Sequence, residues 1–141
     1  MSEHVYAGDK TPQETWDLLS GQPEALLIDV RSSAEWSFVG VPDLSGVGKE
    51  VVLAAWQEFP DMSVNPAFVN QVQNVAPGLS TPLLFLCRSG QRSQAAAAAL
   101  TAAGYTACYN VLEGFEGNKN DAGHRGTVGG WKVCGLPWKQ R

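Results

Sequence analysis

The chain has 141 residues, of which 44% are hydrophobic and 17% charged, enough for one folded domain but too few for two ordinary ones. Ten Lys and Arg residues against fourteen Asp and Glu residues give a formal net charge of −4 at pH 7. This acidic balance argues against a nucleic acid or a membrane surface as a partner. The cysteines number three, an odd count that argues against a framework of disulfides.

The N-terminal sequence MSEHVYAGDK has neither the basic region nor the apolar region of a secretory signal. The longest apolar-looking stretch, residues 95–103, is too short and too rich in alanine to cross a bilayer. We therefore expect a cytoplasmic protein, in which thiols stay reduced unless they are catalytic.

The first part of the chain predicts a helix, a strand and a second, short helix. The sequence from Thr11 to Glu14 is typical of a capping box, with a proline at the first helical position. Residues 25–30 form an apolar run of strand length, as expected of a strand covered on both faces. Ser33 is expected to cap a short helix that continues through Ala34, Glu35 and Trp36.

The alternation continues along the rest of the chain. Residues 40–48 are rich in glycine and predict a loop. The later elements are a strand at 51–56, a helix opening at Asn65-Pro66, a strand at 82–86, a helix at 94–103 and a strand at 107–112. From Gly114 onward glycines are dense, and we expect mostly loop with one short helix.

Strands that alternate with helices predict an α/β fold with a central, mostly parallel sheet and helices on both faces. We expect a single domain over residues 1–141, with residues 118–141 as a glycine-rich C-terminal extension. Trp131 and Trp138 in this extension are expected to pin it onto the core. In such sheets the functional crevice lies beyond the carboxyl ends of the strands, and Cys87 directly follows the clearest predicted strand.

The loop from Cys87 to Ser93 has the sequence Cys-Arg-Ser-Gly-Gln-Arg-Ser and precedes an alanine-rich helix. The unpaired N–H groups of a helix's first turn attract anions, and Gly90 permits a tight, concave backbone. Two arginines add positive charge and two serines add hydroxyl donors. These surroundings stabilise a thiolate, the nucleophilic form of cysteine. The alternative is a cysteine that packs as a small hydrophobic residue, which leaves the polar residues of the loop without a role.

This loop resembles the active-site loop of rhodanese-type sulfurtransferases. Residues 27–31, Leu-Ile-Asp-Val-Arg, followed by Glu35-Trp36, are similar to that family's Asp-Val-Arg segment. Residues 111–117, Val-Leu-Glu-Gly-Phe-Glu-Gly, are similar to its late strand and the Gly-Gly-Phe turn that follows. The three segments stand in the family's order and cover most of the chain from about residue 10 to residue 117. At Gly40-Val41-Pro42-Asp43-Leu44 the chain lacks the histidine of the family's Gly-His-Ile-Pro-Gly-Ala segment.

The resemblance implies a single rhodanese-like domain in which Cys87 takes a sulfane sulfur from a donor such as thiosulfate or a persulfide. The sulfur would rest as a cysteine persulfide and pass to a thiophilic acceptor, a thiol or cyanide, without a metal or an organic cofactor. A protein could also serve as donor or acceptor. The implied substrate-binding residues are Arg88, Ser89, Gly90, Gln91, Arg92 and Ser93. Asp29 and Arg31 would support the fold through buried, charge-assisted hydrogen bonds.

Two other functions stay open at this point. A phosphatase or an arsenate reductase would use a similar loop to bind a tetrahedral oxyanion, with five residues between the cysteine and the arginine. Here four residues separate Cys87 from Arg92, which favours a single added sulfur. A non-catalytic module would instead bind a partner protein and relay sulfur to it.

Residues outside the loop have simpler interpretations. Cys108 lies in an apolar run and is expected in the core. Cys134 is a candidate resolving thiol that would attack a persulfide on Cys87, although an inert thiol is the simpler interpretation. His124 and Arg125 are expected in a solvated loop rather than at an acceptor site. No Cys-x2-Cys or paired-histidine spacing predicts a zinc site.

Overall fold

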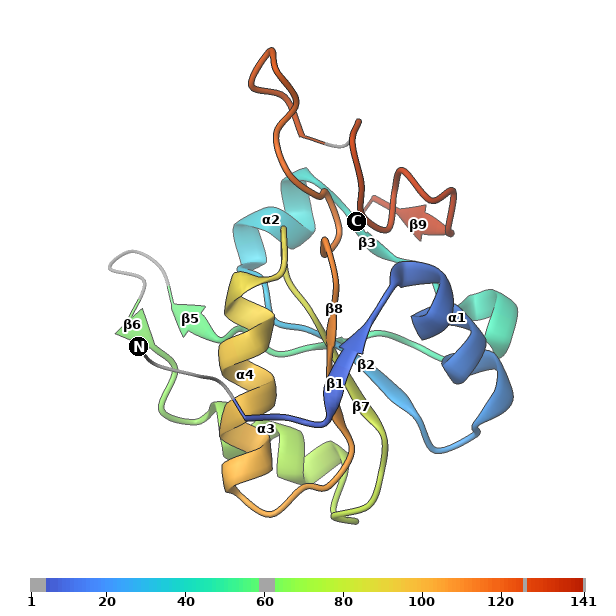
Figure 1. The fold of residues 1–141 in the computed structure, drawn as a ribbon. Coiled ribbons are helices and arrows are strands. Elements are labelled where there is room, and N and C mark those ends of the chain that lie inside the picture. The colour runs from blue at the N-terminus through green and yellow to red at the C-terminus, as the bar shows by residue number, and fades with distance from the viewer. Residues whose placement is uncertain (1–4, 59–62, 126, 141) are drawn as a thin grey trace.

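The computed structural model describes residues 5–58, 63–125 and 127–140, and its centre is a five-stranded sheet (Figure 1). The strands lie in the order β1 (Gly8–Lys10), β8 (Cys108–Val111), β7 (Leu83–Leu86), β2 (Leu26–Asp29) and β4 (Val52–Leu53). Every neighbouring pair is parallel. The carboxyl ends of all these strands therefore lie at the same edge of the sheet.

Helices cover both faces of this sheet, which confirms the predicted α/β class. α3 (Phe68–Val75) and α4 (Gln91–Ala102) pack on one face. α1 (Pro12–Gly21) and the 3-10 turn η1 (Ser45–Val47) pack on the other. α2 (Ser33–Phe38) directly follows β2 at the carboxyl edge (Figure 1). No helix within the described ranges is both long enough and apolar enough to cross a bilayer.

The central strand β7 alternates its side chains between two cores. Leu83 and Phe85 belong to the core beneath α3 and α4, whereas Leu84 and Leu86 belong to the core beneath α1. All four are fully buried, and each contributes roughly 1.5–3 kcal/mol relative to exposure. A strand buried on both faces must be apolar throughout, which explains the continuous run in the sequence. By the same alternation, Cys87 packs on the α4 side.

Small residues allow α4 to approach the sheet closely. Ala96 and Ala97 on its inner face are fully buried, and Leu100 fills the space further along. A longer side chain at either alanine would hold the helix away from β7. The alanine-rich sequence therefore determines how near the first turn of α4 lies to the end of β7.

Side chains cap the starts of α1 and α2. Thr11 Oγ1 accepts a hydrogen bond from the Glu14 N–H at 3.1 Å, and the Glu14 carboxylate accepts one from the Thr11 N–H at 2.9 Å, so the predicted capping box is confirmed. α2 has the same arrangement, but its cap is Ser32, and the prediction of Ser33 is wrong by one residue. The reason is that Glu35, whose carboxylate reaches back to the cap, stands three residues after Ser32.

Other predicted bounds are also wrong. The helix predicted at 94–103 begins at Gln91, because the backbone of Gly90 starts it without a side-chain cap. Segment 40–48, predicted as loop, contains the short strand β3 (Val41–Pro42) as well as η1. After Gly114 the described residues contain no helix, and β9 (Trp138–Lys139) pairs antiparallel with β3 instead.

Two parts of the fold have no counterpart in the sequence prediction. β1, with the sequence Gly-Asp-Lys, takes its extended form by pairing with β8 rather than from any apolar pattern. A second antiparallel pair, β5 (Gln57–Glu58) with β6 (Ser63–Val64), lies outside the main sheet. Short strands of this kind depend on a partner and leave little trace in the sequence.

The C-terminal segment packs into the core beneath α1. Trp131 is fully buried there, Leu136 is nearly so, and the Trp131 ring lies 6.0 Å from that of Trp16. Trp138 is more exposed, and its ring stands edge-on to that of Phe115 at 6.2 Å. The two tryptophans of this segment thus hold it against the domain, as expected.

Asp29, the last residue of β2, and Arg31 form a fully buried ion pair. Arg31 Nη2 lies 2.6 Å from Asp29 Oδ2, and Nε donates to Oδ1 at 2.9 Å. Nη2 also donates to the Gly40 carbonyl at 2.7 Å, and the guanidinium carbon lies 4.3 Å from the centre of the Phe115 ring. The pair therefore connects β2 to the start of β3 and to the turn that contains Phe115.

We expect Asp29→Leu to lower the free energy of unfolding by about 3–5 kcal/mol, because it leaves the buried Arg31 charge without its partner. The double variant Asp29→Leu/Arg31→Met removes both charges and should be more stable than the single variant. Guanidinium chloride unfolding followed by tryptophan fluorescence measures both effects. A double variant no more stable than Asp29→Leu would contradict this account of the pair.

Candidate active site

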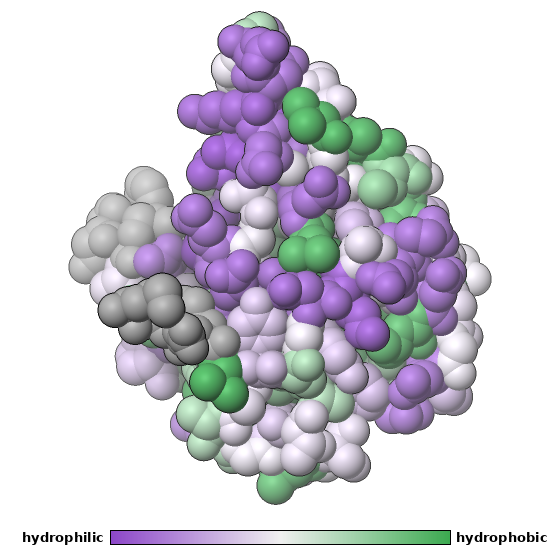
Figure 2. Space-filling model, viewed as in Figure 1, coloured by the Kyte–Doolittle hydropathy of each residue, from purple (hydrophilic) through white to green (hydrophobic). Residues whose placement is uncertain are grey.

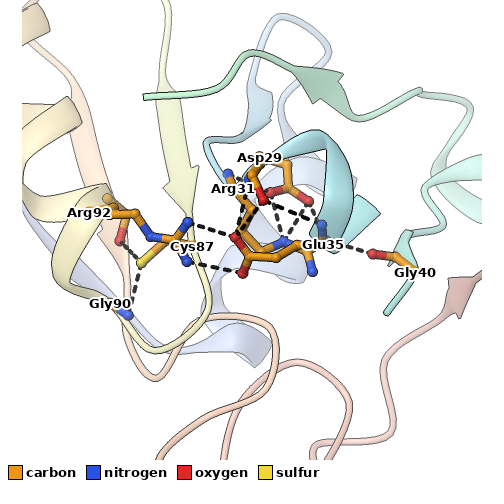
Figure 3. Close-up of polar contacts among 9 residues, drawn as sticks. Asp29, Arg31, Glu35, Gly40, Cys87, Gly90 and Arg92 are labelled. Atoms are coloured by element: carbon orange, nitrogen blue, oxygen red, sulfur yellow. Dashed lines mark hydrogen bonds and ion pairs between the residues drawn. The ribbon is translucent and has the colours of Figure 1, made fainter. Parts of the chain in front are cut away.

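Cys87 lies at the carboxyl end of β7, beneath the first turn of α4. Its side chain is only 1% exposed. The Gly90 N–H donates a hydrogen bond to Cys87 Sγ at 3.0 Å (Figure 3). Ser93 Oγ lies 3.3 Å from the same sulfur. Gly90 has a φ of +117°, a conformation that favours glycine and turns its N–H toward the sulfur.

The early start of α4 changes the surroundings of this sulfur. Arg92 and Ser93 belong to the first turn of a twelve-residue helix, not to a preceding loop. The N–H groups of a first turn have no partner within the helix, and the helix dipole places partial positive charge there. The end of α4 therefore offers backbone donors and a favourable field to negative charge on Cys87.

The Arg92 guanidinium is engaged in an ion pair with Glu35 of α2. Its Nη1 and Nη2 donate to the two carboxylate oxygens at 2.7 Å and 3.0 Å (Figure 3). The pair bridges α4 and α2 beside Cys87, although 57 positions separate the two residues in the sequence. Because Glu35 offsets the charge of Arg92, the loop is less positive than its two arginines suggest.

Burial on its own would raise the pKa of the Glu35 carboxyl. The hydrogen bonds and charge of Arg92, together with hydrogen bonds from Ser32, outweigh burial and lower that pKa from its ordinary 4.5 to about 2. Glu35 is therefore ionised throughout the neutral range, and its pair with Arg92 persists there.

The other loop residues have different environments. The side chains of Arg88 and Gln91 are exposed, and Ser89 is partly buried. The Arg88 carbonyl accepts hydrogen bonds from the N–H groups of Glu116 and Gly117 at 3.0 Å and 3.1 Å. The backbone at Arg88 is thus fixed while its charged side chain faces solvent.

A turn after β8 holds the loop from its other side. The Phe115 N–H donates to the Cys87 carbonyl at 2.8 Å. Gly114 has a φ of +61°, and a Cβ there would lie 2.3 Å from the Cys87 oxygen and 2.6 Å from the Arg88 carbonyl carbon. Only glycine fits at this position. Glu113 also has a left-handed φ, +64°, where the Gly-Gly-Phe turn that this segment resembles has its first glycine.

The C-terminal segment holds this turn in its place. The Trp131 N–H donates to the Gly114 carbonyl at 2.8 Å, and the Gly130 N–H donates to the Glu113 carboxylate at 3.3 Å. Gly117 approaches the same segment so closely that a Cβ there would lie 2.2 Å from a backbone oxygen. The many glycines after residue 113 indicate close contacts between main-chain segments, but the sequence does not show which segments are in contact.

Asn110 and Asp9 are site residues that the sequence analysis missed. Ser93 Oγ donates to Asn110 Oδ1 at 2.5 Å, and Asn110 Nδ2 donates to Asp9 Oδ1 at 3.1 Å. Ser93 and Asn110 are fully buried. The parallel register of β1 with β8 places Asp9 opposite Asn110. The available signal was a single polar residue within the apolar strand of β8.

The remaining candidates lie outside this arrangement. Cys108 is fully buried, as predicted, and burial raises the pKa of its thiol, which makes it a poor nucleophile. Cys134 is exposed, and its role as a resolving thiol stays a prediction. His124 is exposed and Arg125 donates to the Gly117 carbonyl at 2.8 Å, within a projecting, largely hydrophilic segment (Figure 2).

A cavity of about 580 Å³ lies between β3, η1 and β4 and includes no residue of the loop from Cys87 to Ser93. Lys49 in its lining donates to the carbonyls of Gln22 and Ala25, both at 2.7 Å, and is thereby engaged in holding the chain. None of the residues that line the cavity is a cysteine. In the part of the chain that the structure describes, no cluster of three or more His, Cys, Asp or Glu side chains could hold a metal ion.

Comparison with known proteins identifies relatives over nearly the whole chain. A family model described as the STR4 middle domain matches residues 7–141. An uncharacterized protein of Rickettsia conorii is 39% identical over 126 residues, which cover 89% of this chain and 92% of that protein. The chloroplastic rhodanese-like domain-containing protein 4 of Arabidopsis thaliana is 24% identical over 132 residues, which cover 93% of this chain and 25% of that protein.

Solved structures share the fold. The crystal structure of Rv0390 from M. tuberculosis has a TM-score of 0.90 and 50% identity, and the match covers 97% of this chain and 100% of that one. The polysulfide-sulfur transferase homodimer of Wolinella succinogenes has a TM-score of 0.65 and 21% identity, with 96% of this chain and 80% of that one covered. The second likeness concerns the fold alone.

We expect Gly114→Ala to lower the free energy of unfolding by more than about 3 kcal/mol, because the added Cβ meets two backbone carbonyl groups that no side-chain rotation can avoid. Gly135→Ala is the matched control, since Gly135 also has a positive φ, +76°, but nothing lies within 4 Å of its Cβ position. The control should lose only about 1–2 kcal/mol. Chemical unfolding measures both losses, and equal losses would contradict the proposed close approach.

We expect Glu35 to make stability depend on pH in the acid range. Its folded pKa is about 2, below the ordinary value of 4.5, so its contribution is complete above about pH 5 and is lost as pH falls toward 2. Between about pH 5 and pH 2 the free energy of unfolding of the wild type should fall by roughly 3 kcal/mol more than that of Glu35→Gln, whose amide cannot titrate. Urea unfolding at a series of pH values measures this difference. If the free energies of unfolding of the two proteins change in parallel with pH, the expected contribution of Glu35 is wrong.

Proposed function

The chain belongs to the rhodanese-like family of the STR4 middle domain, and from that membership we propose that it is a sulfurtransferase with Cys87 as its sulfur carrier. The donor is a small anion such as thiosulfate, or a persulfide. The acceptor is a thiol or cyanide. A protein that donates or accepts sulfur fits the same scheme.

The observation that carries this proposal is the environment of Cys87 Sγ. The sulfur is buried at the end of β7, and the Gly90 N–H points at it from 3.0 Å at the start of α4. Backbone donors and a helix N-terminus favour negative charge on sulfur, both in the attacking thiolate and in the terminal sulfur of a persulfide. The same few groups therefore support both states of a carrier cysteine.

The proposed reaction has two displacements at sulfur. The Cys87 thiolate attacks the outer sulfur of thiosulfate, a new S–S bond forms, and the old S–S bond breaks with its electron pair leaving on sulfite. Cys87 then carries a persulfide anion. Cyanide attacks the outer sulfur and leaves as thiocyanate, while the electron pair of the S–S bond returns to Cys87 as the thiolate.

We assign the binding of the donor anion to the loop that follows Cys87. The exposed side chain of Arg88 provides positive charge at the surface. Arg92 acts together with Glu35, so it shapes the wall of the site between α4 and α2 rather than adding a full charge. Backbone N–H groups from Arg88 to Ser93 would surround the transferred sulfur.

Phosphoryl or arsenyl chemistry is the weaker alternative. A tetrahedral oxyanion needs a guanidinium that can close on it with two hydrogen bonds. Arg92 already gives such a pair of bonds to Glu35, and only four residues separate it from Cys87. A module that relays sulfur to a partner protein uses the same persulfide and differs only in its acceptor.

The proposed compartment is the reducing cytoplasm, because Cys87, Cys108 and Cys134 are all free thiols. The proposed reaction needs neither a metal nor an organic cofactor, since the cysteine alone carries the transferred atom. Nucleic acids and membranes have no part in it.

Intact-mass measurement after incubation with thiosulfate, or with glutathione persulfide, tests the proposal. We expect the wild type to gain one sulfur atom on Cys87 and to lose it on treatment with cyanide. Cys87→Ser should gain none. Cys108→Ala and Cys134→Ser are matched controls that should load like the wild type, because neither removes the carrier.

The outcomes separate the three functions. A wild type that gains no sulfur from either donor would contradict sulfur transfer. Turnover of a phosphoester or of arsenate would then identify a phosphatase or an arsenate reductase. A persulfide that forms but leaves only in the presence of a protein acceptor would identify a relay. A persulfide that persists longer in Cys134→Ser than in the wild type would identify Cys134 as a resolving thiol.

A further inference from the structure

A continuous line of hydrogen bonds runs from the Cys87 sulfur to the edge of the sheet. Ser93 Oγ lies 3.3 Å from Cys87 Sγ and donates to Asn110 Oδ1 at 2.5 Å. Asn110 Nδ2 donates to Asp9 Oδ1 at 3.1 Å, and the Tyr6 hydroxyl donates to the same Asp9 oxygen at 2.8 Å. Ser93 and Asn110 are fully buried, whereas Asp9 is exposed.

The chemistry of these groups determines the direction of each bond. An ionised Asp9 carboxylate can only accept, so the Asn110 amide must turn its Nδ2 toward Asp9 and its Oδ1 toward Ser93. Oδ1 can also only accept, so it takes the single hydroxyl proton of Ser93. Ser93 Oγ then presents a lone pair to Cys87 Sγ, an arrangement that suits a thiol donating its S–H to Ser93.

We propose that Asn110, oriented by Asp9, is a positioning residue that holds the Ser93 proton away from Cys87 and thereby opposes formation of the nucleophilic thiolate. The proposal deepens the proposed function, on which its biological meaning rests, because it names a control on the same sulfur. A thiolate at Cys87 gains a second hydrogen bond only if the Ser93 hydroxyl rotates and donates to sulfur. The buried Oδ1 of Asn110 then loses its donor, which is unfavourable.

This control opposes the groups that favour the thiolate. The Gly90 N–H, directed at Sγ from 3.0 Å, stabilises negative charge, whereas the Asn110–Ser93 pair stabilises the protonated form. The balance between the Gly90 N–H and the Asn110–Ser93 pair sets the fraction of Cys87 that is present as the reactive thiolate. A donor or acceptor that offers Asn110 Oδ1 or Ser93 a new partner would shift that balance.

Several charged groups surround Cys87 on neighbouring elements, and the test must leave them unchanged. They are Arg92 on α4, Glu35 on α2, the Asp29–Arg31 pair at the end of β2, and Arg88 and Glu113 in the turns on either side. On β1 and just before it, the groups beside Asp9 are Lys10 and Tyr6. None of the substitutions that follow alters a charge within contact of Cys87.

The rate of Cys87 alkylation by iodoacetamide as a function of pH tests the proposal. Asn110→Leu keeps the number and branching of the side-chain heavy atoms and removes Oδ1, so Ser93 becomes free to donate to sulfur. We expect the midpoint of the profile to move to lower pH by about one unit, a tenfold gain in the thiolate-to-thiol ratio. Iodoacetamide reacts with the thiolate, so the alkylation rate reports the ionisation of Cys87 whether or not the protein transfers sulfur.

A double-mutant cycle distinguishes positioning from a general structural effect. In a Ser93→Ala background the hydroxyl is absent, and Asn110→Leu should no longer move the midpoint. Tyr105→Phe is the control for loss of a buried hydrogen bond, since the Tyr105 hydroxyl donates to the Ala76 carbonyl away from the site. It should lower stability and leave the midpoint in place.

Asp9→Ala provides a second route should Asn110→Leu fold poorly, because Asp9 lies on the surface. Without Asp9 the Asn110 amide can reverse and offer Nδ2 to Ser93, so the midpoint should again move to lower pH. Tyr6→Phe keeps the Asp9–Asn110 hydrogen bond and should leave the midpoint of the alkylation profile unchanged.

Two outcomes would overturn the proposal. One is an unchanged midpoint in both Asn110→Leu and Asp9→Ala. The other is that Asn110→Leu shifts the midpoint as far in the Ser93→Ala background as it does in the wild type. Failure of persulfide formation alongside a shifted midpoint would overturn only the proposed function.

Discussion

The site depends above all on the contact between two backbones, at Gly114 and at the end of β7. Because residue 114 has no Cβ, the turn can lie directly against the carbonyl groups of Cys87 and Arg88, and the Phe115 N–H can bond to one of them. This contact fixes the carbonyl side of the loop, while the start of α4 fixes its N–H side. The cysteine is thus held between two rigid pieces of main chain, and its side chain has little freedom of its own.

Four charged side chains near the sulfur form two ion pairs. Asp29 neutralises Arg31 inside the domain, and Glu35 neutralises Arg92 at the mouth of the site. What remains to act on the cysteine is mainly uncharged: the Gly90 N–H and the first turn of α4. Such dipoles cost little reorganisation when charge appears on sulfur, because the fold has already oriented them. The loop therefore works through oriented polar groups more than through its formal charge.

A residue's role can be predicted from the sequence where that role is local. The apolar run of β7, the capping box of α1 and the position of Cys87 after a buried strand all follow from a few neighbouring residues. A role that depends on distant partners cannot be predicted in this way. β1 carries only Gly-Asp-Lys and becomes a strand through β8, and Asn110 acquires its role from Asp9, which is 101 positions away. Glu35 likewise has no visible link to Arg92 until α2 and α4 meet.

The burial of Trp131 has a consequence for where the functional unit ends. All residues of the loop, the whole five-stranded sheet and the Asp29–Arg31 pair occur before residue 118. Yet Trp131 fills the core beneath α1 and bonds to the carbonyl of Gly114, the residue against which the loop rests. A fragment that stops at Gly117 would retain every recognisable motif but leave Phe115 uncovered and the turn unsupported. The smallest piece of this chain able to hold its cysteine in place therefore extends beyond the motifs, to the segment that carries Leu136.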